Sequence, residues 1–248
     1  MATVLIKQRT ANGKSRPRSN GKSRGVTPPI FADNAMLGDV LERLGGIPAS
    51  RVRLFPAPGT ATIRDLRRLD RRTNGTCELI DGVIVEKAMG WYESFLATVL
   101  SSLLTQFVRQ RRLGIVLGAD GTLRILPKQV RAADVSFVSR KRLAKAKPAK
   151  EEPYPAVVPD LAVEVLSKSN TRREMERKLN DYFSAGVLLV WMIDPRRRQA
   201  TVHTSTTSHE VIGLQQTLDG RDVLPGFRVV LQDLFDEVDQ ILEEMNEE

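Results

Sequence analysis

One long stretch of helical periodicity lies among short β-prone runs, and this order constrains the fold more than any other feature of the sequence. Large apolar side chains recur every three or four residues across residues 91–112, which predicts an amphipathic core helix. Two β-prone runs precede it at 77–80 and 83–87, around an Asp-Gly pair that favours a two-residue hairpin turn. Strands that enclose long helices predict a mixed α/β layer, not a helical bundle or a β-sandwich.

The remaining elements alternate between strands and helices. Further strands are predicted at 115–117, 122–126, 135–138, 161–166, 187–193 and 199–204. Further helices are predicted at about 35–44, 62–72 and 172–185. The last of these ends at Gly186. The Lys-, Ala- and Pro-rich run at 141–155 is predicted to be a surface loop.

The net charge of +8 is unevenly distributed along the 248 residues. Residues 1–35 hold seven basic side chains and one acidic, whereas residues 233–248 hold eight acidic side chains and no basic one. Residues 36–232 therefore carry a net charge of +10. A basic body favours a polyanionic partner, although a generally basic soluble protein explains the charge equally well.

Composition also predicts the domain boundaries. Residues 11–25 contain no large apolar side chain, so burial cannot offset the entropy lost on ordering them. We expect a basic disordered tail at 1–34, a single domain at 35–236 and an acidic C-terminal tail at 237–248.

Several classes of protein are excluded by what the sequence lacks. Cys77 is the only cysteine, so no internal disulfide can form, and with only His203 and His209 there is no His/Cys set for zinc. Neither GxxxxGK[ST] nor GxGxxG occurs, which removes the main support for a phosphate-cradling nucleotide fold. The longest apolar runs fall far short of the roughly 20 residues of a membrane span, and we expect a cytoplasmic protein with no membrane partner.

Two carboxylates lie on core-type strands about thirty residues apart. Glu164 interrupts the apolar strand that follows Asp160, and a buried carboxylate needs a cationic or hydrogen-bonding partner. Asp134 opens the strand at 135–138. If the strands are neighbours, the pair offers hard oxygen ligands suited to Mg²⁺. Alternatively, Glu164 faces solvent and Asp134 is a turn residue.

Two further residues could reach the same place. Thr171 and Glu174 match a capping box that fixes the start of the following helix, and the helical period then puts Lys178 on its inward stripe. Lys178 could there stabilise charge on a phosphate, or it could be a snorkelling lysine with a wet ammonium. Glu93, in the first turn of the long helix, is the weakest candidate, because an acid there also suits the helix dipole.

The sequence resembles a known family in five ordered strings that lie within about residues 36–236. These are ELIDG (78–82), ADVSFVS (133–139), PDLAVEVLSKSN (159–170), RKLNDYFSAGV (177–187) and VWMIDP (190–195). Together they resemble the Uma family of the PD-(D/E)xK nuclease superfamily. The resemblance implies an α/β restriction-endonuclease-like fold, a mixed β-sheet flanked by helices.

The resemblance also implies a function and its residues. Asp134 would be the motif aspartate, Glu164 the second carboxylate, Lys178 a lysine displaced onto the helix, and Glu93 an extra polar position of the family. The implied activity is that of an endodeoxyribonuclease that hydrolyses DNA phosphodiester bonds with Mg²⁺, or with Mn²⁺ as the alternative ion. Its metal would be held by Asp134, Glu164 and the carbonyl of Val165. DNA is the expected partner, and a homodimer is a possible assembly.

Three departures from the family pattern keep other interpretations open. Ala133 replaces a proline, Leu166 occupies the lysine position of a strict ExK, and Lys168, a rival lysine, replaces another proline. The protein could instead bind nucleic acid through an inactive site. It could also be a protein-interaction module that binds through its charged tails.

Overall fold

The computed structural model describes residues 31, 34–70 and 76–246. Its main element is a six-stranded sheet in the order β10-β9-β8-β7-β6-β3. Strands β7 and β8 are parallel, and the other neighbouring pairs are antiparallel, so the sheet is mixed as predicted. The strands are β3 (Gly114–Leu117), β6 (Val135–Ser139), β7 (Leu161–Val165), β8 (Leu189–Asp194), β9 (Gln199–His203) and β10 (His209–Ile212).

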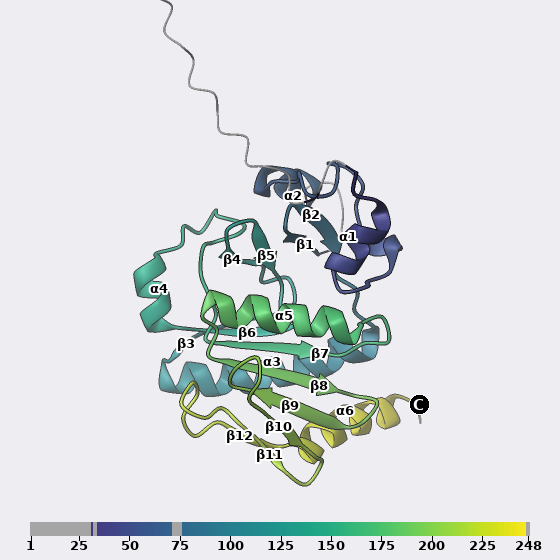
Figure 1. Ribbon diagram of the computed structural model, residues 1–248. Coiled ribbons are helices and arrows are strands. Elements are labelled where there is room, and N and C mark those ends of the chain that lie inside the picture. The colour runs from purple at the N-terminus through teal and green to yellow at the C-terminus, as the bar shows by residue number, and fades with distance from the viewer. Residues whose placement is uncertain (1–30, 32–33, 71–75, 247–248) are drawn as a thin grey trace, which may run out of the picture.

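Helices cover both faces of this sheet (Figure 1). One face packs against α3 (Trp91–Arg111) and α6 (Leu231–Asn246), and the other packs against α5 (Arg172–Ala185). The apolar stripe of α3 predicted from the sequence is buried, with Leu96, Leu100 and Leu104 fully covered. The resulting α/β/α layering is the predicted fold class.

A smaller antiparallel sheet lies on the α5 side, together with the N-terminal helices (Figure 1). Its order is β2-β1-β5-β4, with β1 (Cys77–Ile80), β2 (Val83–Glu86), β4 (Leu123–Leu126) and β5 (Gln129–Arg131). The predicted Asp-Gly hairpin joins β1 to β2. Asp81 and Gly82 have φ values of 50° and 76°, and this turn needs positive φ at both positions.

The remaining elements are short. They are α1 (Leu37–Arg43), a 3-10 helix (Ala49–Arg51), α2 (Ile63–Asp70), α4 (Arg140–Ala146), β11 (Thr217–Asp219) and β12 (Arg228–Val230). The N-terminal segment fixes the start of α5, because Arg51 forms a buried ion pair of 2.8 Å with Glu174. A Cβ on Gly45 would lie 2.5 Å from the Glu174 amide nitrogen, so only glycine permits this close approach.

Two predictions differ from the structure. The predicted loop at 141–155 begins within α4, whose first turn is capped by the Ser139 hydroxyl. The predicted domain boundary at 236 falls inside α6, because Val238 is fully buried against the core and the helix continues beyond it. The predicted basic tail at 1–34 lies outside the described residues, apart from Phe31 and Asn34.

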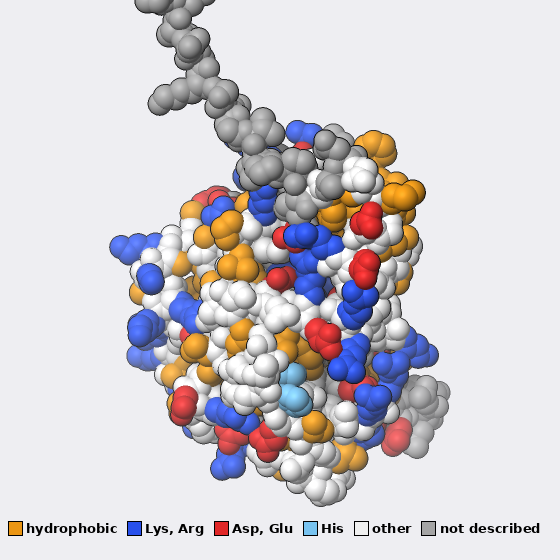
Figure 2. Space-filling model, viewed as in Figure 1, with side chains coloured by type: hydrophobic (Ala, Val, Ile, Leu, Met, Phe, Trp, Pro, Cys, Tyr) orange, Lys and Arg blue, Asp and Glu red, His pale blue; other side chains and the backbone are white. Residues whose placement is uncertain are grey.

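Basic and acidic side chains share the surface on the α5 side of the molecule. Figure 2 shows Lys and Arg side chains spread over this face, with Asp and Glu between them. Within the described ranges, no helix combines the length and apolar character needed to cross a membrane.

Candidate active site

The strand register places Asp134 beside the end of β7 that holds Glu164. Val135, the first residue of β6, pairs with Val163 of β7, and Asp134 and Glu164 are the next residues of the two segments beyond this pair. The amide of Asp134 donates to the carbonyl of Val163 at 2.9 Å, and the charge of Asp134 acts on Glu164. The two carboxylates are thus neighbours, and each residue is 4% exposed.

Helix α5 supplies two partners for Glu164. Lys178 Nζ donates to Glu164 Oε2 at 2.9 Å, and the Tyr182 hydroxyl donates to Oε1 at 2.5 Å. Their spacing of four residues puts both side chains on one face of the helix. The Thr171 hydroxyl accepts from the Glu174 amide at 3.0 Å and so fixes the helix start. Lys178 therefore points at the sheet and is buried.

The smaller sheet contributes three charged side chains that the sequence analysis did not select. Lys87, just after β2, lies 2.7 Å from Asp134 Oδ1. Arg131 lies 2.9 Å from Glu78 Oε2, and Lys178 lies 3.6 Å from Glu78 Oε1. We refer to these residues as the buried charge cluster: Glu78, Lys87, Arg131, Asp134, Glu164 and Lys178. It contains three acids and three bases.

The cluster shifts the pKa values of its members in opposite directions. Burial, and secondarily the charge of Asp134, raises the pKa of Glu164 against the opposing effect of Lys178. Burial alone would also raise the pKa of Glu78, but Lys178 and Arg131 outweigh it and lower this pKa to about 2. For Lys178, burial lowers the pKa but Glu164 and Glu78 outweigh burial and raise it. Lys178 is therefore a fixed cation, not a proton acceptor.

Val165 contacts Asp134 through its amide. The Val165 N–H donates to Asp134 Oδ2 at 2.6 Å, so the second oxygen of this carboxylate is tied to the backbone of β7. The Val165 carbonyl was predicted to be a metal ligand. The observed bond fixes Asp134 beside that residue.

The donor chemistry of the acid pair fits a divalent cation. Mg²⁺ prefers hard oxygen ligands, keeps several waters and needs only one or two protein carboxylates. The charge of Asp134 helps to raise the pKa of Glu164, which shows that the two acids repel each other. A cation between them would relieve this repulsion. Among the residues that the structure describes, no group of three or more His, Cys, Asp or Glu side chains is arranged to hold a metal ion.

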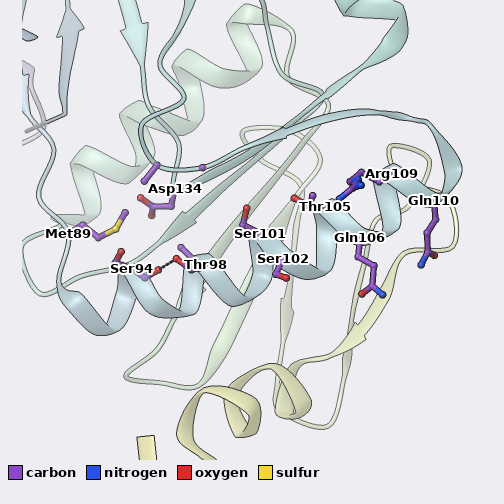
Figure 3. A pocket seen from close by; sticks show the side chains of 13 residues that line it. Met89, Ser94, Thr98, Ser101, Ser102, Thr105, Gln106, Arg109, Gln110 and Asp134 are labelled. Atoms are coloured by element: carbon purple, nitrogen blue, oxygen red, sulfur yellow. Dashed lines mark hydrogen bonds between the residues drawn. The ribbon is translucent and has the colours of Figure 1, made fainter. Parts of the chain in front are cut away.

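Asp134 also borders open space. It lines a groove of about 800 Å³ that lies beside α3. Figure 3 shows its carboxylate near Met89 and Ser94, at one end of a row of polar side chains from the helix. The acid pair is therefore buried, and Asp134 is the member of the pair that borders this groove.

The other candidates are placed by contacts outside the acid pair or by exposure. Glu93 is half-buried, and its carboxylate folds back over Gly90 at the helix start. This position suits an acid that interacts with the helix dipole. Lys168 is exposed in the loop after β7, so it does not replace Lys178. Asp160 pairs with Arg142 at 2.9 Å and accepts from the Ser139 amide, and so supports α4.

One missed residue carried a usable sequence signal. Glu78 interrupts the apolar strand CELI as Glu164 interrupts LAVEV, and the same desolvation argument applies to both. Lys87 carried no such signal, because a lysine that ends a strand beside Glu86 is typical of an exposed strand end.

Comparisons with known proteins agree with this architecture. The sequence matches the family described as "Uma2: Putative restriction endonuclease" over residues 63–232. Among solved structures, a chain described as a "putative nuclease belonging to DUF820" from Anabaena variabilis ATCC 29413 has a TM-score of 0.61 and 17% sequence identity. The alignment covers 70% of this chain and 98% of that one, and at this identity it shows the fold alone. No curated protein matches the sequence. Because the family match spans more than half of the residues, the chain belongs to the Uma2 family.

Proposed function

We propose that the protein is a metal-dependent endonuclease that hydrolyses DNA phosphodiester bonds. The observation that carries the proposal is the placement of Asp134 beside Glu164 at the neighbouring ends of β6 and β7, with Lys178 bonded to Glu164 and a groove open to Asp134. Membership of a family described as restriction endonucleases supports DNA as the substrate.

Each side chain has a role that follows from its contacts. Asp134 and Glu164 would hold a Mg²⁺ or Mn²⁺ ion, which when bound polarises the phosphate and activates water. Lys178 and Tyr182 position Glu164 by bonding one oxygen each. Lys87 balances the charge of Asp134 and so lowers its repulsion toward an approaching phosphate.

Nicking of supercoiled DNA tests this proposal. The wild type should convert the substrate only when Mg²⁺ or Mn²⁺ is present. Asp134→Asn and Glu164→Gln should each slow the reaction by about a hundredfold or more, since a bound metal supplies several kcal/mol to the transition state. Lys168→Met, which alters an exposed lysine, is the matched control and should cut at the wild-type rate. Equal rates for the wild type and both acid variants would refute the proposal.

The charge balance of the cluster favours a second candidate function. Lys87 pairs with Asp134 and Lys178 pairs with Glu164, so protein side chains already balance both acids of the pair, and Leu166 holds the lysine position of a strict ExK. A protein of this kind would bind DNA without cutting it. DNA binding that is unchanged in Asp134→Asn, together with no metal-dependent nicking by the wild type, would favour this alternative.

A further inference from the structure

The groove beside α3 extends far beyond the acid pair. It is lined along the helix from Ser94 to Gln110, which at 1.5 Å per residue corresponds to about 24 Å. At one end it meets Asp134, Gly118 and Ala119. A groove of this length offers much more contact surface than one scissile phosphate needs.

The groove side of α3 is polar, whereas its other side forms the core. Figure 3 shows Ser94, Thr98, Ser101, Thr105 and Arg109 in one row along the helix. Successive members of this row are three or four residues apart, so they share a face. Ser102, Gln106 and Gln110 form a second row that also lines the groove.

Most of these side chains have unused hydrogen-bonding capacity. The Thr98 hydroxyl donates to the Ser94 carbonyl at 2.8 Å. Within the described residues, the side chains of Ser101, Thr105, Gln106 and Arg109 form no hydrogen bond or ion pair with the protein. Hydroxyl, amide and guanidinium donors of this kind are the usual partners of phosphate oxygens.

We propose that this groove seats the phosphodiester backbone of one strand of a nucleic-acid duplex and leads it to Asp134. The inference rests on the proposed function and names the form of its substrate. About 24 Å of helix spans about seven base-pair steps at 3.4 Å of duplex rise, and a straight groove contacts only those phosphates of the strand that face it. A site that contacts only the backbone binds independently of base sequence.

The lining favours a duplex over a single strand. Proteins that hold single strands stack the bases on aromatic side chains. None of the described residues that line the groove is aromatic. A stacked duplex keeps its bases inside and presents its phosphates, which is the surface that the groove side chains can bind.

The charges around the groove agree with an anionic occupant. Arg109 lines it toward the C-terminal end of α3, away from Asp134 (Figure 3). Among the described residues that line the groove, Asp134 is the one acid, and Lys87 balances its charge at 2.7 Å. A phosphate chain in the groove would therefore meet the cation of Arg109 and a neutralised anion at Asp134.

Binding of fluorescently labelled duplex DNA in EDTA tests the inference without cleavage. Arg109→Ala should weaken the affinity roughly five- to tenfold at low salt and reduce the slope of log K against log salt by about 1. Ser102→Glu, at an exposed lining position, should weaken it similarly. Arg111→Ala is the matched control, because it removes an equal charge from a neighbouring arginine that lies over the Phe107 ring. The affinity of this control for the duplex should stay within about twofold of the wild-type affinity. A single strand of the same length should bind the wild type more weakly than the duplex does.

The outcomes separate this inference from the proposed function. The inference is overturned if the wild type binds no duplex, if Arg109→Ala and Arg111→Ala bind alike, or if the single strand binds as tightly as the duplex. Duplex binding that depends on Arg109, without nicking under any metal condition, would retain the groove and reject the nuclease. If the wild type nicks DNA in a metal-dependent way and Arg109→Ala binds the duplex as tightly as the wild type, the nuclease is retained and the groove is rejected.

Discussion

Replacing Lys87 by methionine would leave Asp134 as a buried carboxylate without its ammonium partner. The two side chains are 7% and 4% exposed and lie 2.7 Å apart. Removal of one partner from such a buried pair costs about 3–5 kcal/mol. For a protein of this size each kcal/mol changes the Tm by about 2–4 °C. We therefore expect Lys87→Met to lower the Tm by about 6–20 °C in EDTA.

Added Mg²⁺ should reverse much of this loss, because Asp134 then has another cation and no competing ammonium. A Mg²⁺ concentration one hundred times the Kd would restore about 2.7 kcal/mol. Thermal unfolding with EDTA and with a Mg²⁺ series measures both effects. Lys168→Met is the control for loss of an exposed lysine, and Lys87→Met combined with Asp134→Asn should be more stable than Lys87→Met alone. A Lys87→Met Tm equal to that of the control would refute the reasoning, and an unchanged Mg²⁺ response would remove Asp134 from the metal site.

Three further predictions concern stability. Tyr182→Phe removes the hydroxyl that bonds Glu164 at 2.5 Å, and urea unfolding should show a loss of about 1.5–3 kcal/mol; no loss would contradict the bond. The folded pKa of Glu78, about 2, lies below the ordinary value of about 4.3, so its contribution to stability is present above pH 4.3 and disappears as the pH falls toward 2. Glu78→Gln should therefore lose less stability than the wild type between pH 5 and 3, and equal losses would count against this shift. A chain that ends at Asp236 loses the buried Val238, so its Tm should fall; an unchanged Tm would support the predicted acidic tail.

Local elements followed from local chemistry. The helix at 172–185 was predicted with its observed ends, because Thr171 caps its start and Gly186, with a φ of 95°, ends it. The Asp-Gly hairpin was predicted for the same reason, since its turn geometry depends on two adjacent residues. The strands β5, β10, β11 and β12 and the helices α4 and α6 were not predicted. The four strands are only three or four residues long, and much of the burial of α6 depends on contact with α3.

The acidic segment at 237–248 shows how composition misled the boundary. Its many acids predicted a tail, but one side of the helix packs Val238 into the core while Asp239 accepts from the Tyr92 hydroxyl at 2.9 Å. Net charge reports the composition of a segment and not which side of a helix is buried. Local sequence was equally incomplete for the site. The apolar strand around Glu164 identified that residue as buried, but the residues around Lys87 gave no such indication.

The sequence by itself determined the α/β class and the strands and helix that carry Asp134, Glu164 and Lys178. It also determined the helical spacing that turns Lys178 toward the sheet. These depend on periodicity and capping, which act within a few residues. Only the tertiary structure decided that Asp134 lies beside Glu164, that Glu78 and Lys87 join the buried charge cluster, and that a polar groove leads to Asp134. Strand pairing and ion pairing join residues that are far apart in sequence, and their free energy arises only when burial excludes water from the assembled contacts.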